Sequence, residues 1–256
     1  MRNIINKYLR KFGIKLLNSS NITDIGNFPE DIDSDARAIL TKVRNYTMTS
    51  IERQIALIDA TRYIVKNNIS GDFVECGVWK GGSMMAVAYC LQSLGELDRN
   101  LYLYDTFEGM TEPSDKDVSH SNVKASVLLS KSLKADQSSI WCYSSLDEVK
   151  SNIQSTGYDP SKVFLIKGKI EETIPKYIPQ KVALLRLDTD WYESTLHELR
   201  HLFPLLVSGG VLIIDDYGHW QGCRQAVDEY IAENKIKIFL NRIDYTGRIG
   251  IALHTT

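Results

Sequence analysis

The sequence predicts an α/β domain built on a mostly parallel β-sheet with an antiparallel edge. From residue 71 onward, short apolar runs alternate with longer amphipathic segments, a pattern typical of β–α units joined by right-handed crossovers. The last two apolar runs, 236–240 and 249–254, are separated only by the short link 241–248. Such a link predicts an antiparallel hairpin at the edge of the sheet.

Seven strands and the helices around them follow from this pattern. The predicted strands are 73–75, 101–104, 163–166, 182–187, 211–214, 236–240 and 249–254, each a short apolar run bounded by polar or turn-forming residues. The helices predicted from apolar residues at helical spacing are 35–43, 51–67, 83–94, 121–134, 146–156, 171–177, 194–206 and 222–234. Ser50 directly precedes one of them, and we expect its hydroxyl to cap that helix.

The first 17 residues form a basic amphipathic pattern with five Lys or Arg residues and no acidic residue. A helix packed on its own domain or on a second subunit is the interpretation we favour, and contact with a membrane surface is the alternative. Residues 19–34 are polar and read as a linker. We therefore divide the chain into an N-terminal helical extension or lid, 1–45, and the α/β domain itself, 46–256.

The composition argues against several classes of protein. A formal net charge of −2 over 256 residues gives no reason to expect a nucleic-acid partner. The four cysteines are far apart and form no C-x-x-C pair, so we expect a reducing compartment, the cytoplasm, rather than a disulfide framework. No apolar run approaches the ~18 residues of a membrane span, and the N-terminus lacks the uninterrupted apolar stretch of a signal peptide.

A glycine-rich turn, within GDFVECGVWKGGS, joins the first strand of the alternating region to the next helix. Glu75 ends the strand, Gly77, Gly81 and Gly82 follow, and Ser83 opens the helix. Glycines let the backbone approach a ligand closely, and a helix N-terminus offers free N–H groups. The spacing differs from the G-x-G-x-x-G of dinucleotide binding. A nucleotide-like cofactor and plain close packing of helix on strand both remain open here.

Carboxylates end several of the predicted strands, where open α/β sheets bind their ligands. Asp105 occupies the place where an acidic residue commonly binds ribose hydroxyls, although it could equally cap a helix. Asp188 and Asp190 follow one strand, and Asp215 and Asp216 follow its expected neighbour. Carboxylates this close raise one another's pKa unless a cation is present. We therefore predict a Mg²⁺ site, with Asp188 a better ligand candidate than Asp190.

Histidines suggest two further readings. His197-Glu198-Leu199-Arg200-His201 matches the H-E-x-x-H zinc motif, but it falls on a predicted helix with no further ligand evident, so we interpret it as a chance match. His219 follows the proposed metal ligands closely. Substrate contact or acid–base chemistry is one interpretation, and an exposed loop histidine is the other.

Four segments together resemble the macrocin O-methyltransferase family, which includes sugar methyltransferases of the mycinamicin and novobiocin pathways. They are GDFVECGVWKGGS, LYLYDTFEGM, LLRLDTDWYEST and GGVLIIDDYGHWQGCRQAVDEY, and the resemblance spans about residues 45–240. It implies a Rossmann-like class I methyltransferase that uses S-adenosylmethionine and Mg²⁺ to methylate a sugar hydroxyl. The arrangement is more distantly similar to catechol O-methyltransferase, in which strand-end carboxylates hold a metal that binds the acceptor oxygen.

The resemblance implies roles for matching residues. The methionine part of the cofactor would be surrounded by Glu75, Gly77, Gly81, Gly82 and Ser83 and covered by Tyr46, Thr47 and Met48. Asp105 would bind the ribose, and Ile170 and Glu171 would lie near the adenine. Mg²⁺ would be held by Asp188, Asp215 and Asp216, with Asp188 as general base and Asp190 as the second candidate.

The acceptor side is expected to contain Asp190, Tyr192, Tyr217, His219 and Trp220. Aromatic faces suit the C–H surfaces of sugars, but each aromatic residue could instead be core packing. The resemblance also implies a sugar-containing acceptor and a homo-oligomer in which the N-terminal region contributes lids and subunit contacts. Two alternatives remain open: a nicotinamide-dependent oxidoreductase, which the glycine spacing disfavours, and a non-catalytic cofactor-binding scaffold of the same fold.

Overall fold

The structure, a computed structural model, describes residues 28–136 and 139–253. The basic helix predicted over 1–17, and most of the linker that follows it, lie outside the described residues. Within the described part of the chain, no helix combines the length and the apolar character that crossing a membrane requires.

A seven-stranded sheet forms the centre of the domain, in the order β3-β2-β1-β4-β5-β7-β6. The strands are β1 Asp72–Cys76, β2 Leu101–Asp105, β3 Val163–Lys167, β4 Val182–Leu187, β5 Leu206–Ile214, β6 Asn241–Arg242 and β7 Arg248–Ile251. The first five are parallel, whereas β7 pairs antiparallel with both β5 and β6. The predicted parallel sheet with an antiparallel edge hairpin is therefore confirmed.

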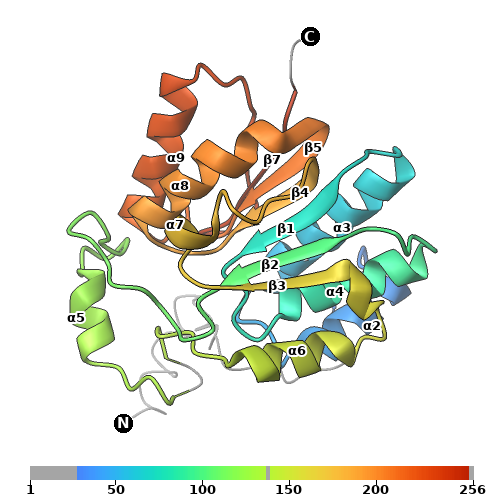
Figure 1. Cartoon of the computed structure of the whole chain (residues 1–256), viewed down its shortest axis with the longest axis horizontal. Helices are drawn as coiled ribbons and strands as arrows, with labels where there is room; N and C mark the ends of the chain where they lie inside the picture. The colour runs from blue at the N-terminus through green and yellow to red at the C-terminus, as the bar shows by residue number, and fades with distance from the viewer. Residues whose placement is uncertain (1–27, 137–138, 254–256) are drawn as a thin grey trace, which may run out of the picture.

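Helices cover both faces of the sheet, as Figure 1 shows. One face carries α2 (Ser34–Val43), α3 (Ile51–Lys66), α4 (Gly82–Ser93) and α6 (Leu146–Gln154), whose apolar residues share one core cluster. The other face carries α7 (Ile170–Thr173), α8 (Tyr192–Leu202) and α9 (Gln221–Glu233), which share a second cluster. The short helix α5 (Ala125–Ser130) stands apart from the sheet in Figure 1, and its residues Ala125 and Leu129 belong to this second cluster. Two short 3₁₀ turns, Pro160–Lys162 and Phe203–Leu205, precede β3 and β5.

The strand register aligns charged residues inside the apolar sheet. Arg186 on β4 lies opposite Glu75 of β1 on one side and Ile213 of β5 on the other. Because side chains alternate between the two faces of a strand, Asp188 shares a face with Arg186, and Asp215 shares one with Ile213. The register therefore brings Glu75, Arg186, Asp188 and Asp215 to the same edge and face of the sheet.

The edge strand begins later than the sequence predicts. Residues 236–240 are not in a strand, and β6 starts only at Asn241. Ile236, Ile238 and Leu240 pack against the core, while the side chain between the last two, Phe239, is 81 % exposed. This irregular segment packs every second side chain against the domain, which explains the alternating pattern that predicted a strand.

Two helices are shorter than predicted. The helix expected over 121–134 begins only at Ala125, because the preceding residues form a turn closed by a bridge between Val118 and Lys124. The helix expected over 171–177 ends at Thr173. Pro175 disfavours a helical conformation at the residue before it, which explains this early end.

Candidate active site

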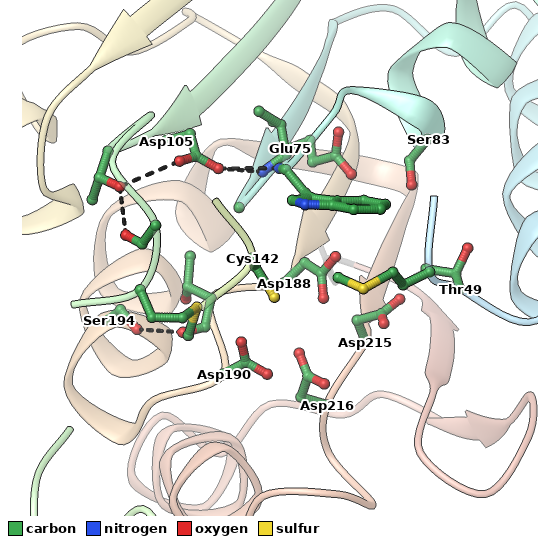
Figure 2. Close-up of a pocket in the computed structure, with 18 of the residues that line it drawn as sticks. Thr49, Glu75, Ser83, Asp105, Cys142, Asp188, Asp190, Ser194, Asp215 and Asp216 are labelled. Atoms are coloured by element: carbon green, nitrogen blue, oxygen red, sulfur yellow. Dashed lines mark hydrogen bonds between the residues drawn. The ribbon is translucent and has the colours of Figure 1, made fainter. Parts of the chain in front are cut away.

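A cavity of about 450 Å³ lies beyond the carboxyl ends of the central strands. Segments distant in the sequence line it: the loop 46–49 before α3, the glycine turn after β1, the ends of β2, β4 and β5, and the turn between β6 and β7. Figure 2 shows carboxylates from several strands pointing into this space. Its size and position are those of a small-molecule site in an open α/β sheet.

Two glycines of the turn are required by close backbone approaches. Gly77 has a positive φ of 81°, and a Cβ atom there would lie 2.0 Å from the carbonyl oxygen of Asp188. A Cβ atom on Gly82 would lie 2.3 Å from the carbonyl oxygen of Tyr46, which accepts a hydrogen bond from the Gly82 N–H. The end of β4 and the loop 46–49 therefore press directly on the turn.

The loop 46–49 is tied to α3 and α4 by hydroxyl groups. Gln54 donates from Nε2 to the hydroxyl of Thr49 over 2.5 Å, and more weakly to that of Ser83 over 3.4 Å. The hydroxyls of Thr47 and Thr49 lie 2.8 Å apart. Tyr46, Thr47 and Met48 all line the cavity, and Met48 is 49 % exposed. This loop is placed where it can cover a ligand held by the glycine turn.

Asp105, at the end of β2, organises the glycine turn through its carboxylate. It accepts backbone hydrogen bonds from Val78 over 2.8 Å, Trp79 over 3.2 Å and Phe107 over 2.7 Å. Burial raises its pKa, and the same hydrogen bonds oppose that shift. The residue also lines the cavity. Since carboxylate oxygens accept more than one hydrogen bond, binding of a ribose stays a prediction beside this role.

Arg186 joins three carboxylates that come from three different strands. It donates to Glu75 over 2.5 Å, to Asp188 over 2.7 Å and to Asp215 over 2.5 Å, and its side chain is 3 % exposed. Asp215 is also paired with Arg53 of α3. Burial raises the pKa of Glu75 to about 7 against the opposing effect of Arg186. Removing one partner of such a buried ion pair leaves the other charge buried without a counter-charge, which is strongly destabilising. The ion pairs therefore hold these side chains in place.

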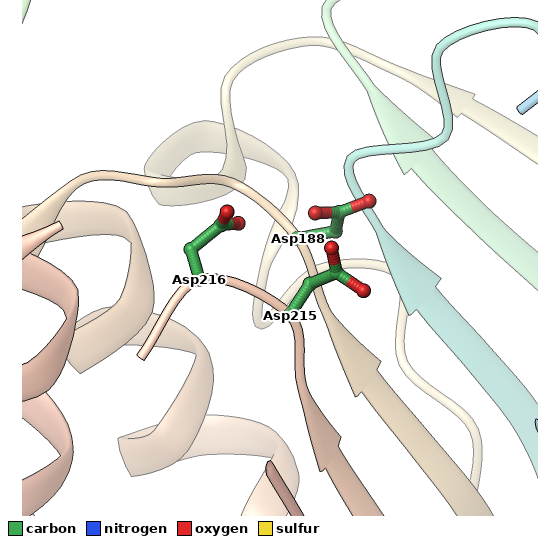
Figure 3. Close-up of side chains that lie close together, drawn as sticks. All are labelled: Asp188, Asp215 and Asp216. Carbon is green, nitrogen blue, oxygen red and sulfur yellow. The ribbon is translucent and has the colours of Figure 1, made fainter. Parts of the chain in front are cut away.

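The predicted metal ligands do lie together. Asp188, Asp215 and Asp216 each offer a carboxylate oxygen within 4.8 Å of the others. Figure 3 shows the three side chains close together at the ends of their strands. Burial, followed by the negative charges of neighbouring carboxylates, raises the pKa of Asp216 well above its ordinary value. The same two causes raise the pKa of Asp188, against the opposing charge of Arg186.

The donor set fits a hard divalent cation. Oδ2 of Asp216 is buried and has no hydrogen-bond partner among the described residues. Oxygen-only ligands and clustered negative charge are what Mg²⁺ requires. Arg53 and Arg186 supply two positive charges against five carboxylates, which are Glu75, Asp188, Asp190, Asp215 and Asp216. A cation at this cluster would relieve the remaining repulsion.

The residues beyond the cluster form the open side of the cavity. Trp220 donates from Nε1 to Asp190 over 2.7 Å, and both residues line the cavity. Burial and the charge of Asp188 raise the pKa of Asp190 to about 8. Nδ1 of His219 lies 3.1 Å from the hydroxyl of Tyr245. Burial and the nearby charges of His120 and Arg53 lower the pKa of His219, so its neutral form is favoured.

Not every predicted site residue reaches the cavity. Three of them lie elsewhere, since Gly81, Tyr192 and Tyr217 do not line it. Gly81 faces the side chains of Val149 and Ile153 on α6. The hydroxyl of Tyr192 donates to Glu229 over 2.6 Å, and that of Tyr217 to Asp228 over 2.8 Å. These contacts make Gly81 a packing position and turn both tyrosines toward α9.

The remaining predicted residues line the cavity. They are Glu75, Gly77, Gly82, Ser83, Ile170, Glu171, Asp188, Asp190, Asp215, Asp216, His219 and Trp220, together with the loop residues and Asp105 described above. Their contacts with a cofactor, a metal or an acceptor stay predictions, because a place in the cavity lining does not by itself show a contact with a ligand.

The side chains of the H-E-x-x-H segment are engaged by the protein itself. Glu198 is fully buried and accepts a hydrogen bond from the Thr189 hydroxyl over 2.8 Å. Nε2 of His197 lies 3.0 Å from the carbonyl oxygen of Ile174, and Nδ1 of His201 lies 2.9 Å from that of His197. These contacts agree with the interpretation of the motif as a chance match.

The sequence did not predict several residues of the site, chiefly Arg53 and Tyr245, which line the cavity, and Arg186, which pairs with carboxylates that line it. Arg186 had a signal, since it is the one charged residue inside the apolar run VALLRL and lies two positions before Asp188. Arg53 and Tyr245 had none. They reach the site because α3 and the β6–β7 turn meet there, a juxtaposition that only the tertiary fold creates.

The chain is similar to known methyltransferases. The family described as macrocin-O-methyltransferase (TylF) matches residues 5–249. A relative from Streptomyces olivaceus, the 8-demethyl-8-(2,3-dimethoxy-alpha-L-rhamnosyl)-tetracenomycin-C 4'-O-methyltransferase, is 31% identical over 202 residues, which cover 79% of this chain and 74% of that protein. The mycinamicin III 3''-O-methyltransferase of Micromonospora griseorubida is 30% identical over 202 residues, or 79% of this chain and 76% of that protein.

A solved structure has the same architecture. The O-methyltransferase NovP superposes with a TM-score of 0.72 at 29% sequence identity, covering 82% of this chain and 83% of that one. The class I fold therefore matches in three dimensions as well as in sequence, and the family match extends over most of the chain. This chain belongs to the macrocin-O-methyltransferase family and is an O-methyltransferase.

Proposed function

We propose that this protein transfers the methyl group of S-adenosylmethionine to a hydroxyl of a sugar or glycosylated acceptor, with the help of Mg²⁺. The observation that carries the proposal is the cluster of Asp188, Asp215 and Asp216, which faces the glycine turn across one cavity. The name of the Streptomyces olivaceus relative specifies methylation of a rhamnosyl compound, and this supports a sugar-containing acceptor.

The residues that would hold each group follow from their positions. The glycine turn, the loop 46–49 and Asp105 would hold the cofactor, with Ile170 and Glu171 on the side of its adenine. Asp188, Asp215 and Asp216 would hold the metal. When bound, the cation acts as a Lewis acid toward the acceptor hydroxyl, and the cofactor supplies a methyl group on a positively charged sulfur.

The chain's own residues orient the reactants and move one proton. S-adenosylmethionine would supply the methyl group to the acceptor oxygen and would leave as S-adenosylhomocysteine, so the proton of the hydroxyl has to be accepted by a residue of the chain. Asp188 accepts the proton of the hydroxyl, and Arg186 holds Oδ2 of Asp188 in a fixed position. The loop 46–49 excludes water from the transfer. Asp190, His219 and Trp220 line the acceptor side.

Two further expectations accompany the proposal. Cys76, Cys90, Cys142 and Cys223 are all free thiols in the structure, as a protein of the reducing cytoplasm would have them. Assembly into a homo-oligomer stays a prediction from the family resemblance.

The direct test measures methyl transfer from labelled S-adenosylmethionine to methyl α-L-rhamnopyranoside and to dTDP-rhamnose. We expect transfer with Mg²⁺, loss in excess EDTA, and a loss of about a hundredfold or more in Asp188→Ala. Asp115→Asn is the control, because Asp115 is exposed and, among the residues that the structure describes, pairs only with Lys124 at the surface. Full activity in EDTA would refute the metal requirement.

Calorimetric binding of NAD, without binding of S-adenosylhomocysteine, would favour the oxidoreductase alternative, and cofactor binding without turnover would favour the scaffold.

A further inference from the structure

The turn between β6 and β7, residues 243–247, is anchored by the carboxylate of Asp244. Its Oδ1 accepts backbone hydrogen bonds from Thr246 over 2.9 Å and Gly247 over 2.7 Å. Its Oδ2 accepts from the hydroxyl of Ser50 over 2.7 Å and from Nε of Arg53 over 3.0 Å. One partly buried carboxylate thus shapes the turn and binds it to the start of α3.

The same turn is also fixed to the metal-ligand segment. The hydroxyl of Thr246 donates to the backbone carbonyl of Asp215 over 2.8 Å, and the N–H of Gly218 donates to the carbonyl of Thr246 over 2.9 Å. Gly218 approaches so closely that a Cβ atom there would lie 2.1 Å from the carbonyl oxygen of Tyr245. The backbone of the turn is therefore held from two sides next to Asp215.

The side chain of Tyr245 stands apart from this network. It is 57 % exposed although it lines the cavity. Its hydroxyl lies 3.1 Å from Nδ1 of His219, and its ring centroid lies 6.0 Å from those of His120 and His219. Anchoring the turn needs the carboxylate of Asp244 and the hydroxyl of Thr246, but it does not use the Tyr245 ring. A rigid turn thus presents a half-open aromatic face at the mouth of the cavity.

We infer that Tyr245 is a specificity-determining residue that contacts the acceptor sugar, and that Asp244 is the positioning residue that holds it. This inference rests on the proposed function. An aromatic ring offers an apolar face to the C–H surface of a sugar, and a tyrosine adds a hydroxyl for one polar contact. Asp244, paired with Arg53, sets the place of that ring relative to Asp215 and hence to the carboxylate cluster.

The test compares Tyr245→Ala, Tyr245→Phe and Asp244→Asn for methylation of whichever of the two rhamnose compounds the wild type uses better. Loss of the aromatic contact should raise KM for the acceptor up to about tenfold in Tyr245→Ala. We expect kcat to change little, the affinity for S-adenosylhomocysteine to stay the same, and Tyr245→Phe and Asp244→Asn to show smaller rises. Tyr177→Ala, which removes a 60 % exposed tyrosine outside the cavity lining, is the matched control.

Saturation-transfer NMR with methyl α-L-rhamnopyranoside, in the presence of S-adenosylhomocysteine and Mg²⁺, supplies a readout that needs no turnover. A sugar signal in the wild type that weakens in Tyr245→Ala supports the inference even if no methyl transfer occurs, in which case only the proposed function fails. An unchanged KM and an unchanged sugar signal in Tyr245→Ala would overturn the inference while methylation by the wild type stands. Absence of sugar binding and methylation in the wild type would overturn both.

Discussion

Glu198 on α8 is a carboxylic acid placed entirely inside the protein. Its Oε1 accepts a hydrogen bond from Thr189, whereas its buried Oε2 has no partner among the described residues. Burial raises the pKa of Glu198 well above its ordinary value, the Thr189 hydrogen bond opposes this, and the negative charges of Glu171 and Asp188 add to it. An unpaired carboxylate is costly in such surroundings, so the neutral acid is the form that the fold stabilises.

The stability of the protein should therefore depend on the proton of Glu198. Above the ordinary pKa of 4.5, the unfolded chain loses this proton while the folded protein keeps it. Stability from this residue is complete below pH 4.5 and is lost as the pH rises through the folded pKa, by up to about 1.4 kcal/mol per pH unit. Glu198→Gln keeps the shape without the titration. Urea denaturation from pH 5 to 8 should show that the free energy of unfolding of the variant increases relative to that of the wild type as the pH rises. A difference that stays constant over this range would contradict the prediction.

At the scale of elements, the site depends on how the loop 46–49 meets the N-terminus of α4. The contact is made by backbone, since Gly82 donates to the carbonyl of Tyr46 over 3.0 Å. Ser50 caps α3 by accepting from the Arg53 N–H over 3.2 Å, and it also donates to Asp244. The capping residue predicted from the sequence therefore does two tasks, starting a helix and linking the cofactor side of the cavity to the β6–β7 turn.

Gly82→Ala should separate the loop from α4. A methyl group there meets backbone atoms of Tyr46 at 2.3 and 2.5 Å, which no rotamer change can relieve. If the loop covers the cofactor, the affinity for S-adenosylhomocysteine should fall by about tenfold or more, equivalent to about 1.4 kcal/mol. Isothermal titration calorimetry measures it. Ser93→Ala, at the opposite end of α4, should bind as the wild type does; equal binding by Gly82→Ala would contradict the covering role of the loop.

The sequence predicted the order and type of most elements because their periodicity is strong. Four of the five parallel strands and α2, α3, α4, α6 and α9 form close to where they were expected. In contrast, α8 ends at Leu202, before the predicted end at 206, and β5 begins at Leu206, before the predicted start at 211. The strand predicted over 236–240 is wrong. Its side chains alternate as those of a strand do, but the segment does not pair with the sheet, and a local sequence pattern does not show whether a segment has a pairing partner. The helix predicted over 121–134 was given too early a start, because Asn122, with a φ of 61°, belongs to a turn.

The site was predictable where its residues end strands. The carboxyl ends of parallel strands meet at one edge, which is why the Asp188, Asp215 and Asp216 cluster could be foreseen. Tyr192 and Tyr217 were harder, because a residue beside a ligand segment can turn either way, and here both hydroxyls bond to α9. Arg53 and Tyr245 could not be foreseen, since each comes from an element whose place in space is set by packing far from the strand ends.

Across the whole molecule, charge is distributed very unevenly. The chain has a formal net charge of only −2, yet seven carboxylates line one cavity, with Arg53 and the adjacent Arg186 as counter-charges. Among the described residues that line the cavity, Arg53 is the only lysine or arginine. Such a concentration of negative charge destabilises the folded protein until a cation shares it. The global stability of the protein should therefore respond to divalent cations.

Mg²⁺ should raise the melting temperature of the protein through this cluster. A ligand at a hundred times its Kd stabilises the folded state by about 2.7 kcal/mol, which corresponds to roughly 5–10 °C for a chain of this size. Asp216→Asn removes a charge whose buried Oδ2 has no partner among the described residues, so the Mg²⁺-induced shift should shrink. Differential scanning fluorimetry, with NaCl at matched ionic strength, separates specific binding from screening. Asp115→Asn should keep the full shift, whereas an equal shift in Asp216→Asn would place the cation elsewhere.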